Sequence, residues 1–392
     1  MKISQIDLRI IQDSRGEDTL EAIVASGTLN VTSSIPAGKS KGKNEASSVI
    51  PAVALQKFQI IKDEILGIDF PGILEFDNFL KKADGTLDKS NLGGNLILVL
   101  SICFIKLFAK VNNLQTYQLI GQMLGKKPGM FPYLYFNLIG GGLHAENSLP
   151  FQEYILVTKF NSPAKCLEYA RNVVEKLQAD ISKNFGETRV GDEGTFSVKS
   201  SDPLLGLEIL KRNADDPEVS FALDVAGSTF YNKGEYKIGE RILSTEQMLE
   251  FYMNLFSKFP LLSIEDPFSE DDGKGFVEIC KIFKDKTWII GDDLTVTNKD
   301  LIQRAIDAQQ ITGVIIKPNQ IGSVSETLDA IRLAQNNNLK IIVSHRSGET
   351  NDDFIADLAF GVGADGLKSG APTQPQRLAK YNRLIEIERE VS

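Results

Sequence analysis

The second half of the chain contains a series of short apolar runs, each of which ends at a charged or titratable residue. The six runs end, in chain order, at Asp224, Glu265, Asp292, Lys317, His345 and Lys368. The first interval is the longest, and the later ones are about 25 residues each, enough for one strand, one crossover helix and two short loops. Continuously apolar strands are typical of a parallel sheet covered by helices on both faces. The pattern therefore predicts an α/β fold, a (β/α) barrel with these charged strand ends at its C-terminal rim, where active sites of such barrels lie.

The first 127 residues follow other patterns, and we expect them to form a smaller α+β domain. Alternating apolar and polar residues predict three strands, over 3–10, 19–26 and 29–35, and the last two form a hairpin. The pattern is helical from residue 46 to 125. After Lys127 the composition shifts towards proline, glycine and aromatic residues. We therefore predict a capping domain over 1–127 and a catalytic barrel domain over 128–392.

The predicted barrel domain opens with two further strands before the main series begins. They cover residues 133–139 and 151–157, and a helix follows over 163–184. The end of the chain, residues 376–390, carries apolar residues along one side. This spacing predicts an amphipathic closing helix.

Composition and charge narrow the possible functions. The net charge of −9 argues against nucleic-acid binding as the main task, and an anionic substrate would need a local positive site. The three cysteines are far apart in the chain, which favours a reducing cytoplasmic location over a disulfide framework. The apolar run 96–109 is interrupted by Lys106 and is too short to span a bilayer. We expect a buried helix there and no membrane association.

Three carboxylates, Asp224, Glu265 and Asp292, follow successive apolar strands. Oxygen ligands of this kind, with room for water and substrate oxygens, suit Mg²⁺. The alternative is that they are helix N-caps or surface acids, because Asp is common in the loops between strand and helix. Their position after three strongly apolar strands favours the metal site.

Lys317 is a candidate general base and Glu193 a candidate second acid–base group. A lysine acts as a base when nearby positive charge lowers its pKa, and Lys368 and a bound metal could supply that charge. Glu193 lies in the turn Gly191–Gly194 and could face Lys317 across the barrel. The spacing alone also allows Lys317 to be an ordinary salt-bridge partner and Glu193 a plain turn residue.

The only two histidines, His144 and His345, both lie in turns rich in glycine or serine, which favours a functional role over a structural one. Arg346 and Ser347 follow His345 directly and could hold a phosphate through a guanidinium fork and a hydroxyl. A further lysine- and glycine-rich loop covers residues 36–43. It is either a solvated surface loop or a mobile lid that brings positive charge to an anionic substrate.

Motifs along nearly the whole chain resemble those of the enolase family. They are Asp13–Gly16, Asp84–Thr86, Gly191–Gly194, Ser263–Asp266, Gly291–Asn298, Lys317–Gly322, Ser344–Thr350 and Arg377–Asn382. The stretch Ser344–Thr350 is highly specific. The resemblance implies an enolase-type (β/α)8 barrel with partly antiparallel first strands, a smaller N-terminal α+β domain and a homodimer or larger homo-oligomer.

The resemblance also implies an activity and a set of site residues. The activity is the glycolytic lyase reaction, the reversible dehydration of 2-phosphoglycerate to phosphoenolpyruvate, with Mg²⁺ as cofactor. Lys317 matches the base and Glu193 the acid. The remaining matches are Asp224, Glu265 and Asp292 for the metal, Arg346 and Ser347 for the phosphate, Lys368 for the substrate carboxylate, and His144, Gln152, Glu153 and His345 for further active-site positions.

Some positions depart from the family pattern, chiefly around the lid loop. Ala37 stands where the family has a serine whose hydroxyl and carbonyl help to hold a second Mg²⁺, so only the backbone carbonyl is kept. Two alternatives follow: an enzyme for another carboxylate substrate, or a paralogue with reduced activity that serves as a binding or scaffold protein. The intact phosphate-binding residues argue against the first, and the intact pair of Lys317 and Glu193 argues against the second.

Overall fold

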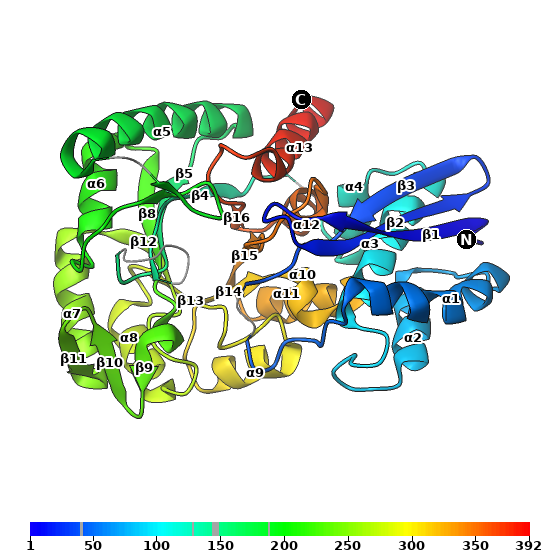
Figure 1. Ribbon diagram of the computed structural model, residues 1–392, viewed down its shortest axis with the longest axis horizontal. Coiled ribbons are helices and arrows are strands. Elements are labelled where there is room, and N and C mark those ends of the chain that lie inside the picture. Colours follow the sequence, from blue (N-terminus) through cyan, green and yellow to red (C-terminus); the bar gives the residue numbers. More distant parts are fainter. Residues whose placement is uncertain (40–41, 128, 143–148, 187–188) are drawn as a thin grey trace.

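The computed structural model describes residues 1–39, 42–127, 129–142, 149–186 and 189–392. A smaller N-terminal part, blue to cyan in Figure 1, lies beside a larger barrel coloured green to orange. The closing helix α13 (Pro375–Val391) lies near both parts, in red. The fold is therefore the predicted barrel with a smaller N-terminal domain.

The N-terminal part is a three-stranded antiparallel sheet packed against helices. Its elements are β1 (Gln5–Gln12), β2 (Asp18–Ser26), β3 (Leu29–Ser34), α1 (Pro51–Gly67), α2 (Ile73–Asp84), α3 (Gly94–Val111) and α4 (Thr116–Met123). The strands pair in the order β1-β2-β3, and the antiparallel pair of β2 and β3 is the predicted hairpin. Helix α3 is long and apolar enough to cross a membrane by length and composition. Most of it is nevertheless buried, and it contacts β2 and β3, as expected of a core helix.

Eight of the described strands close into a barrel. They are β4 (Tyr133–Gly140), β5 (Glu153–Thr158), β8 (Val219–Asp224), β12 (Leu261–Glu265), β13 (Trp288–Gly291), β14 (Gly313–Ile316), β15 (Lys340–Ser344) and β16 (Gly366–Lys368). The pairing of β16 with β4 closes the ring. Strand β5 runs antiparallel to both β4 and β8, and the other neighbours in the ring are parallel.

Helices cover the outside of the barrel. They are α5 (Pro163–Phe185), α6 (Leu205–Asn213), α7 (Thr245–Lys258), α8 (Gly273–Phe283), α9 (Lys299–Asp307), α11 (Val324–Asn336), α12 (Phe354–Val362) and α13, with a short α10 (Pro318–Ile321). A separate buried cluster, which includes Tyr135, Ile155, Ile290 and Ile315, draws side chains from several barrel strands. These residues fill the barrel interior beneath its rim, so the barrel is a packed core and not a pore.

Two small insertions add short strands to the barrel fold. An antiparallel meander of β9 (Tyr231–Asn232), β10 (Glu235–Ile238) and β11 (Arg241–Ser244) lies between β8 and α7, after the 3₁₀ turn η2 (Gly227–Phe230). It accounts for the long first interval in the sequence pattern. A short hairpin of β6 (Arg189–Val190) and β7 (Phe196–Ser197) adds to β4 and places the turn Gly191–Gly194 beside the rim.

The N-terminal part is fixed to the barrel at the loop after β15. The backbones of Ala37 and Gly348 form an antiparallel bridge. Lys106 of α3 forms a salt bridge of 2.8 Å with Asp352, which also accepts a hydrogen bond of 2.6 Å from the Ser33 hydroxyl. Residues of both parts therefore reach the C-terminal rim of the barrel.

Candidate active site

The six charged or titratable residues of the sequence pattern all lie at the C-terminal ends of barrel strands. Strands β8, β12 and β16 end at Asp224, Glu265 and Lys368. Asp292, Lys317 and His345 directly follow β13, β14 and β15. Five of the six line one cavity, which also includes Gln152, Glu153, Glu193, Arg346, Ser347 and Lys39. The sixth, Glu265, joins them through a contact with Lys368.

Lys368 is a buried lysine surrounded by carboxylates. Its Nζ lies 2.9 Å from Glu153 Oε2, 3.2 Å from Asp224 Oδ2 and 2.7 Å from Glu265 Oε2. Burial opposes the charged form of Lys368, but these carboxylates outweigh it and raise the pKa of the lysine well above its usual value. Lys368 is therefore a permanent cation that holds three strand ends together.

Lys317 forms a buried ion pair with Asp292, whose other oxygen accepts a hydrogen bond of 2.9 Å from Gln320 Nε2. Burial lowers the pKa of Lys317, as do Lys368 and Arg346, but Asp292 and Glu265 raise it more. The pKa of Lys317 is therefore raised here, whereas the base hypothesis expected a lowered pKa. The physical reason is that the negative charges of Asp292 and Glu265 outweigh burial and the two cations. The sequence alone does not show which charged groups surround Lys317.

The donor set fits a divalent cation at the predicted carboxylates. Glu265 Oε1 is buried and has no hydrogen-bond partner among the described residues. Burial, and then the charge of Asp224, raise the pKa of Glu265 well above its usual value. A cation would provide a partner for Oε1 and offset this repulsion, and hard oxygen donors of this type suit Mg²⁺.

Acidic side chains also cluster in two other combinations with metal-ligand spacing. Potential ligand atoms of Asp266, Asp292 and Asp293 lie within 4.8 Å of one another, and so do those of Glu153, Glu193 and His345. Asp266 already accepts hydrogen bonds from the backbone amides of Asp292 (3.0 Å) and Asp293 (2.7 Å). It therefore holds the turn that presents Asp292.

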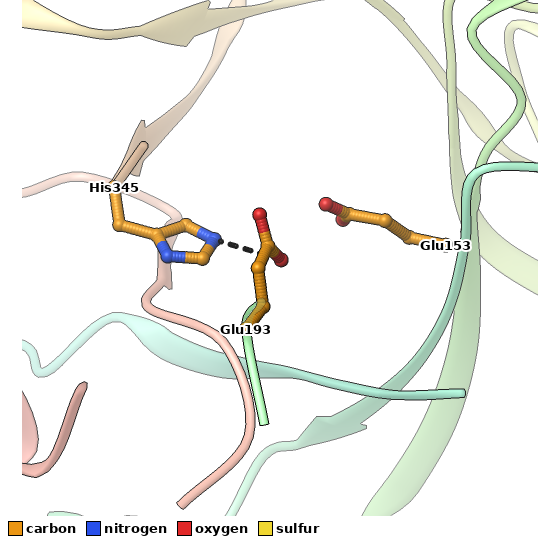
Figure 2. Close-up of side chains that lie close together, drawn as sticks. All are labelled: Glu153, Glu193 and His345. Atoms are coloured by element: carbon orange, nitrogen blue, oxygen red, sulfur yellow. Dashed lines mark ion pairs between the residues drawn. The ribbon is translucent and has the colours of Figure 1, made fainter. Parts of the chain in front are cut away.

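Glu193 lies between His345 and Glu153 (Figure 2). Its Oε2 accepts a hydrogen bond of 3.0 Å from Asn137 Nδ2 and lies 3.5 Å from His345 Nε2. Burial lowers the pKa of His345 well below its usual value, although Glu193 opposes this. Burial also raises the pKa of Glu153 to about 8, with added repulsion from Glu193 and Asp224 and with opposition from Lys368. A neutral imidazole and closely spaced carboxyl groups are suited to proton transfer.

The predicted phosphate-binding residues lie at the junction with the N-terminal part. Arg346 Nη1 and Nη2 contact Glu45 Oε2 and Oε1 at 3.0 and 3.1 Å. The Ser347 hydroxyl accepts a hydrogen bond of 2.8 Å from the backbone amide of Lys39. The described part of loop 36–43 also reaches two loops of the rim, because Lys39 pairs with Asp192 and Lys43 with Asp271. The described part of this loop therefore lies against the rim of the barrel.

The remaining predicted site residues are Gln152, Ala37 and His144, and only the first lines the cavity among the described residues. Gln152 lines the cavity, and its Nε2 lies 3.4 Å from Asp224 Oδ2. The Ala37 carbonyl accepts from the Gly348 amide at 3.0 Å and from Arg15 Nη2 at 3.4 Å, so it serves the junction between the two parts. Ala37 is also absent from the described lining of the cavity. His144 lies outside the described residues.

Further residues contact the site and were not predicted from the sequence, among them Asp266, Asp293, Asn137, Gln320, Glu45 and Arg377. Asn137 is a buried polar residue within the apolar strand β4, and this pattern could have marked it. Gln320 follows Lys317 within a quoted motif, and Arg377 lies in another. Nothing in the local sequence indicates that Glu45 pairs with Arg346, some 300 residues away.

Comparisons with known proteins agree with this geometry. Residues 3–120 match the family model "Enolase, N-terminal domain", and residues 129–392 match "Enolase, C-terminal TIM barrel domain". A protein named Enolase from Sulfurisphaera tokodaii is 39% identical over 99% of this chain and 96% of its own length. Proteins of the same name from Ehrlichia ruminantium and Nitratiruptor sp. are 38% and 36% identical, also over 99% of this chain, and over 96% and 97% of their own lengths.

Proposed function

Since the chain belongs to the enolase family, we propose that it is a lyase that reversibly dehydrates 2-phosphoglycerate to phosphoenolpyruvate, a step of glycolysis. The observation that carries the proposal is that Lys317 and Glu193 line the same cavity as Asp224, Asp292 and Arg346. A base, an acid, metal-binding carboxylates and a guanidinium are the groups that this reaction requires.

Lys317 is the proposed base. Its Nζ would take the proton from the carbon next to the substrate carboxylate, which requires the neutral amine. Because Lys317 contacts Asp292, the pKa of Lys317 depends on which other groups also contact the Asp292 carboxylate. Lys368 and Arg346 act in the required direction, since both lower the pKa of Lys317.

Glu193 is the proposed acid, which would give a proton to the departing hydroxyl group. The hydrogen bond from Asn137 and the nearby imidazole of His345 hold its carboxyl group in place. Glu153 lies on its other side (Figure 2), and the mutual repulsion of the two acids favours a proton shared between them.

We assign Asp224, Glu265 and Asp292 as the ligands of Mg²⁺, on the strength of the unpartnered Glu265 Oε1 and the all-oxygen donor set. When bound, the cation supplies positive charge that stabilises the negative charge developing on the substrate carboxylate. Lys368, at the end of strand β16, would add a second cationic contact to this carboxylate.

Arg346 and Ser347 are the proposed phosphate contacts. A guanidinium fork and a hydroxyl are a suitable pair for a phosphate, and the amide of Lys39 lies at the same hydroxyl. Glu45 holds the fork of Arg346, so phosphate binding would exchange one anionic partner of Arg346 for another. Gln152, His144 and His345 complete the proposed set of site residues.

Location and assembly are part of the proposal. Cys103, Cys166 and Cys280 are all free and buried, which supports work in the reducing cytoplasm. Family membership supports a homodimer or a larger homo-oligomer, which light scattering on the purified protein would test.

The test is the rise in ultraviolet absorbance as the purified protein acts on 2-phosphoglycerate during a Mg²⁺ titration. We expect turnover in the native protein and a loss of at least about a hundredfold in Lys317→Ala, as for removal of a general base. Lys340→Ala is the matched control, because Lys340 begins β15 at the opposite end of the barrel and pairs with Asp365. A folded protein without turnover at any Mg²⁺ concentration would contradict the proposal.

A further inference from the structure

Arg377, on helix α13, is completely buried beside the active site. Its guanidinium donates hydrogen bonds of 2.6 Å to the carbonyls of Arg346 and Ser347, and one of 3.3 Å to the carbonyl of Asp192. The first two carbonyls belong to the loop of His345, and the third directly precedes Glu193. One side chain therefore ties together the two loops that carry the proposed acid and its histidine neighbour.

The same guanidinium reaches the histidine ring. Arg377 Nη1 lies 2.5 Å from His345 Nδ1. Arginine is only a donor and keeps its protons in proteins, so Nδ1 must act as the acceptor and carry no proton. A neutral imidazole with a bare Nδ1 has its proton on Nε2. Burial favours this neutral form of His345.

The ring nitrogen that carries the proton faces Glu193. His345 Nε2 is the ring nitrogen that lies 3.5 Å from Glu193 Oε2 (Figure 2). Gly370 lies beside both side chains, because a Cβ added at this position would lie only 3.1 Å from His345 Cε1 and from Arg377 Cδ. His345 Nε2 and the side-chain amide of Asn137 thus both lie near the same carboxyl oxygen of Glu193.

We propose that Arg377 is a positioning residue for the proposed reaction: it fixes His345 as the tautomer with its proton on Nε2, so that the ring presents a donor to Glu193. This inference rests on the proposed function of Glu193 as the acid. A donor to the carboxyl group stabilises the carboxylate that remains after the proton has been given away. Arg377 would act through His345 and would not touch the substrate.

A purely structural role is the competing explanation, in which Arg377 only fastens α13 to the rim. Among the described residues Arg377 forms no salt bridge with a carboxylate, and a buried cation without one costs free energy. Its neighbour on the helix, Lys380, already fastens α13 to the same loop through Glu349 Oε2 (2.6 Å) and the Thr350 carbonyl. Lys380 therefore provides the matched control.

The direct test is nitrogen NMR of protein labelled with ¹⁵N-histidine, because the chain has only two histidines and a His144→Gln sample assigns the signals. We expect His345 to show a proton on Nε2 and a bare Nδ1. A proton on Nδ1 in the native protein would overturn the inference, whatever the variants do. In Arg377→Met, or in Arg377→Lys if the first does not fold, we expect the tautomers to mix, and an unchanged spectrum would equally overturn it.

Kinetics provide a second readout. We expect Arg377→Lys to lower kcat by about tenfold to a hundredfold, the range known for residues that orient metal-ligating histidines, and to change KM far less. Lys380→Arg, the reciprocal exchange on the same helix, should leave both the tautomer and kcat nearly unchanged. Equal losses in the two variants would favour the structural explanation. Since the NMR measurement requires no turnover, failure of the proposed function would not be confused with failure of this inference.

Discussion

Arg346 and Glu45 form a bidentate ion pair that connects the barrel rim to the N-terminal part, with N–O distances of 3.0 and 3.1 Å. Both side chains are almost fully buried, at 6% and 5% exposure. The pair therefore links the position of the N-terminal segment to the availability of the proposed phosphate-binding group.

The first prediction concerns this pair. We expect Glu45→Gln to bind inorganic phosphate several-fold more tightly than the native protein, because the Glu45 carboxylate no longer competes with phosphate for Arg346. Calorimetric titration with phosphate measures this effect. In Arg346→Gln phosphate binding should be lost, and weaker binding in Glu45→Gln would contradict the competition.

The second prediction concerns the metal. A ligand that binds only the folded state raises the melting temperature, so we expect Mg²⁺ to raise it in the native protein and a chelator to reverse the rise. In Glu265→Gln the rise should be largely lost, because a carboxylate ligand is gone. Glu278→Gln, on the surface helix α8, should keep the full rise. An undiminished rise in Glu265→Gln would remove Glu265 from the ligand set.

The third prediction concerns pH. Burial raises the pKa of Asp77 to about 6, although hydrogen bonds from Ser101 and Ser325 oppose the shift. The folded state then binds the proton more tightly than the unfolded state, so this group lowers the free energy of unfolding as pH rises from about 4 to about 6.

We therefore expect Asp77→Asn to gain stability relative to the native protein across this pH range and to keep a gain of about 2–3 kcal/mol above it. Urea unfolding at several pH values measures the difference. A difference that does not change with pH would show that the pKa of Asp77 is not raised.

The fourth prediction concerns the junction. Burial disfavours the charged form of Lys106, but Asp352 and Asp353 raise its pKa above the usual value. We expect Lys106→Met to lose about 3–5 kcal/mol of unfolding free energy, because Asp352 is left buried without its cation. The double variant Lys106→Met/Asp352→Asn should recover part of this loss, and denaturant unfolding of the three proteins would show whether it does.

Much of the barrel could be predicted from the sequence, because its pattern is local. An apolar strand that ends at a charge must bring that charge out at the edge of the sheet, and this holds for Asp224, Glu265 and Lys368 without knowledge of any contact. The N-terminal strands could also be predicted, since apolar and polar residues alternate along a strand that has one buried and one exposed face. The meander β9–β11 was missed because its strands are only two to four residues long.

The groups at the ends of the barrel strands follow from the sequence alone, because each continuously apolar run shows which positions are buried and the charge after it shows where the strand ends. Only the tertiary structure decided which of these groups meet: Lys368 with three carboxylates, Lys317 with Asp292, and Arg377 with His345. These contacts join residues far apart in the chain, and the burial and charge around each group set its pKa. For this reason the expected lowering of the pKa of Lys317 was reversed, and the role of Arg377 became visible only in the folded protein.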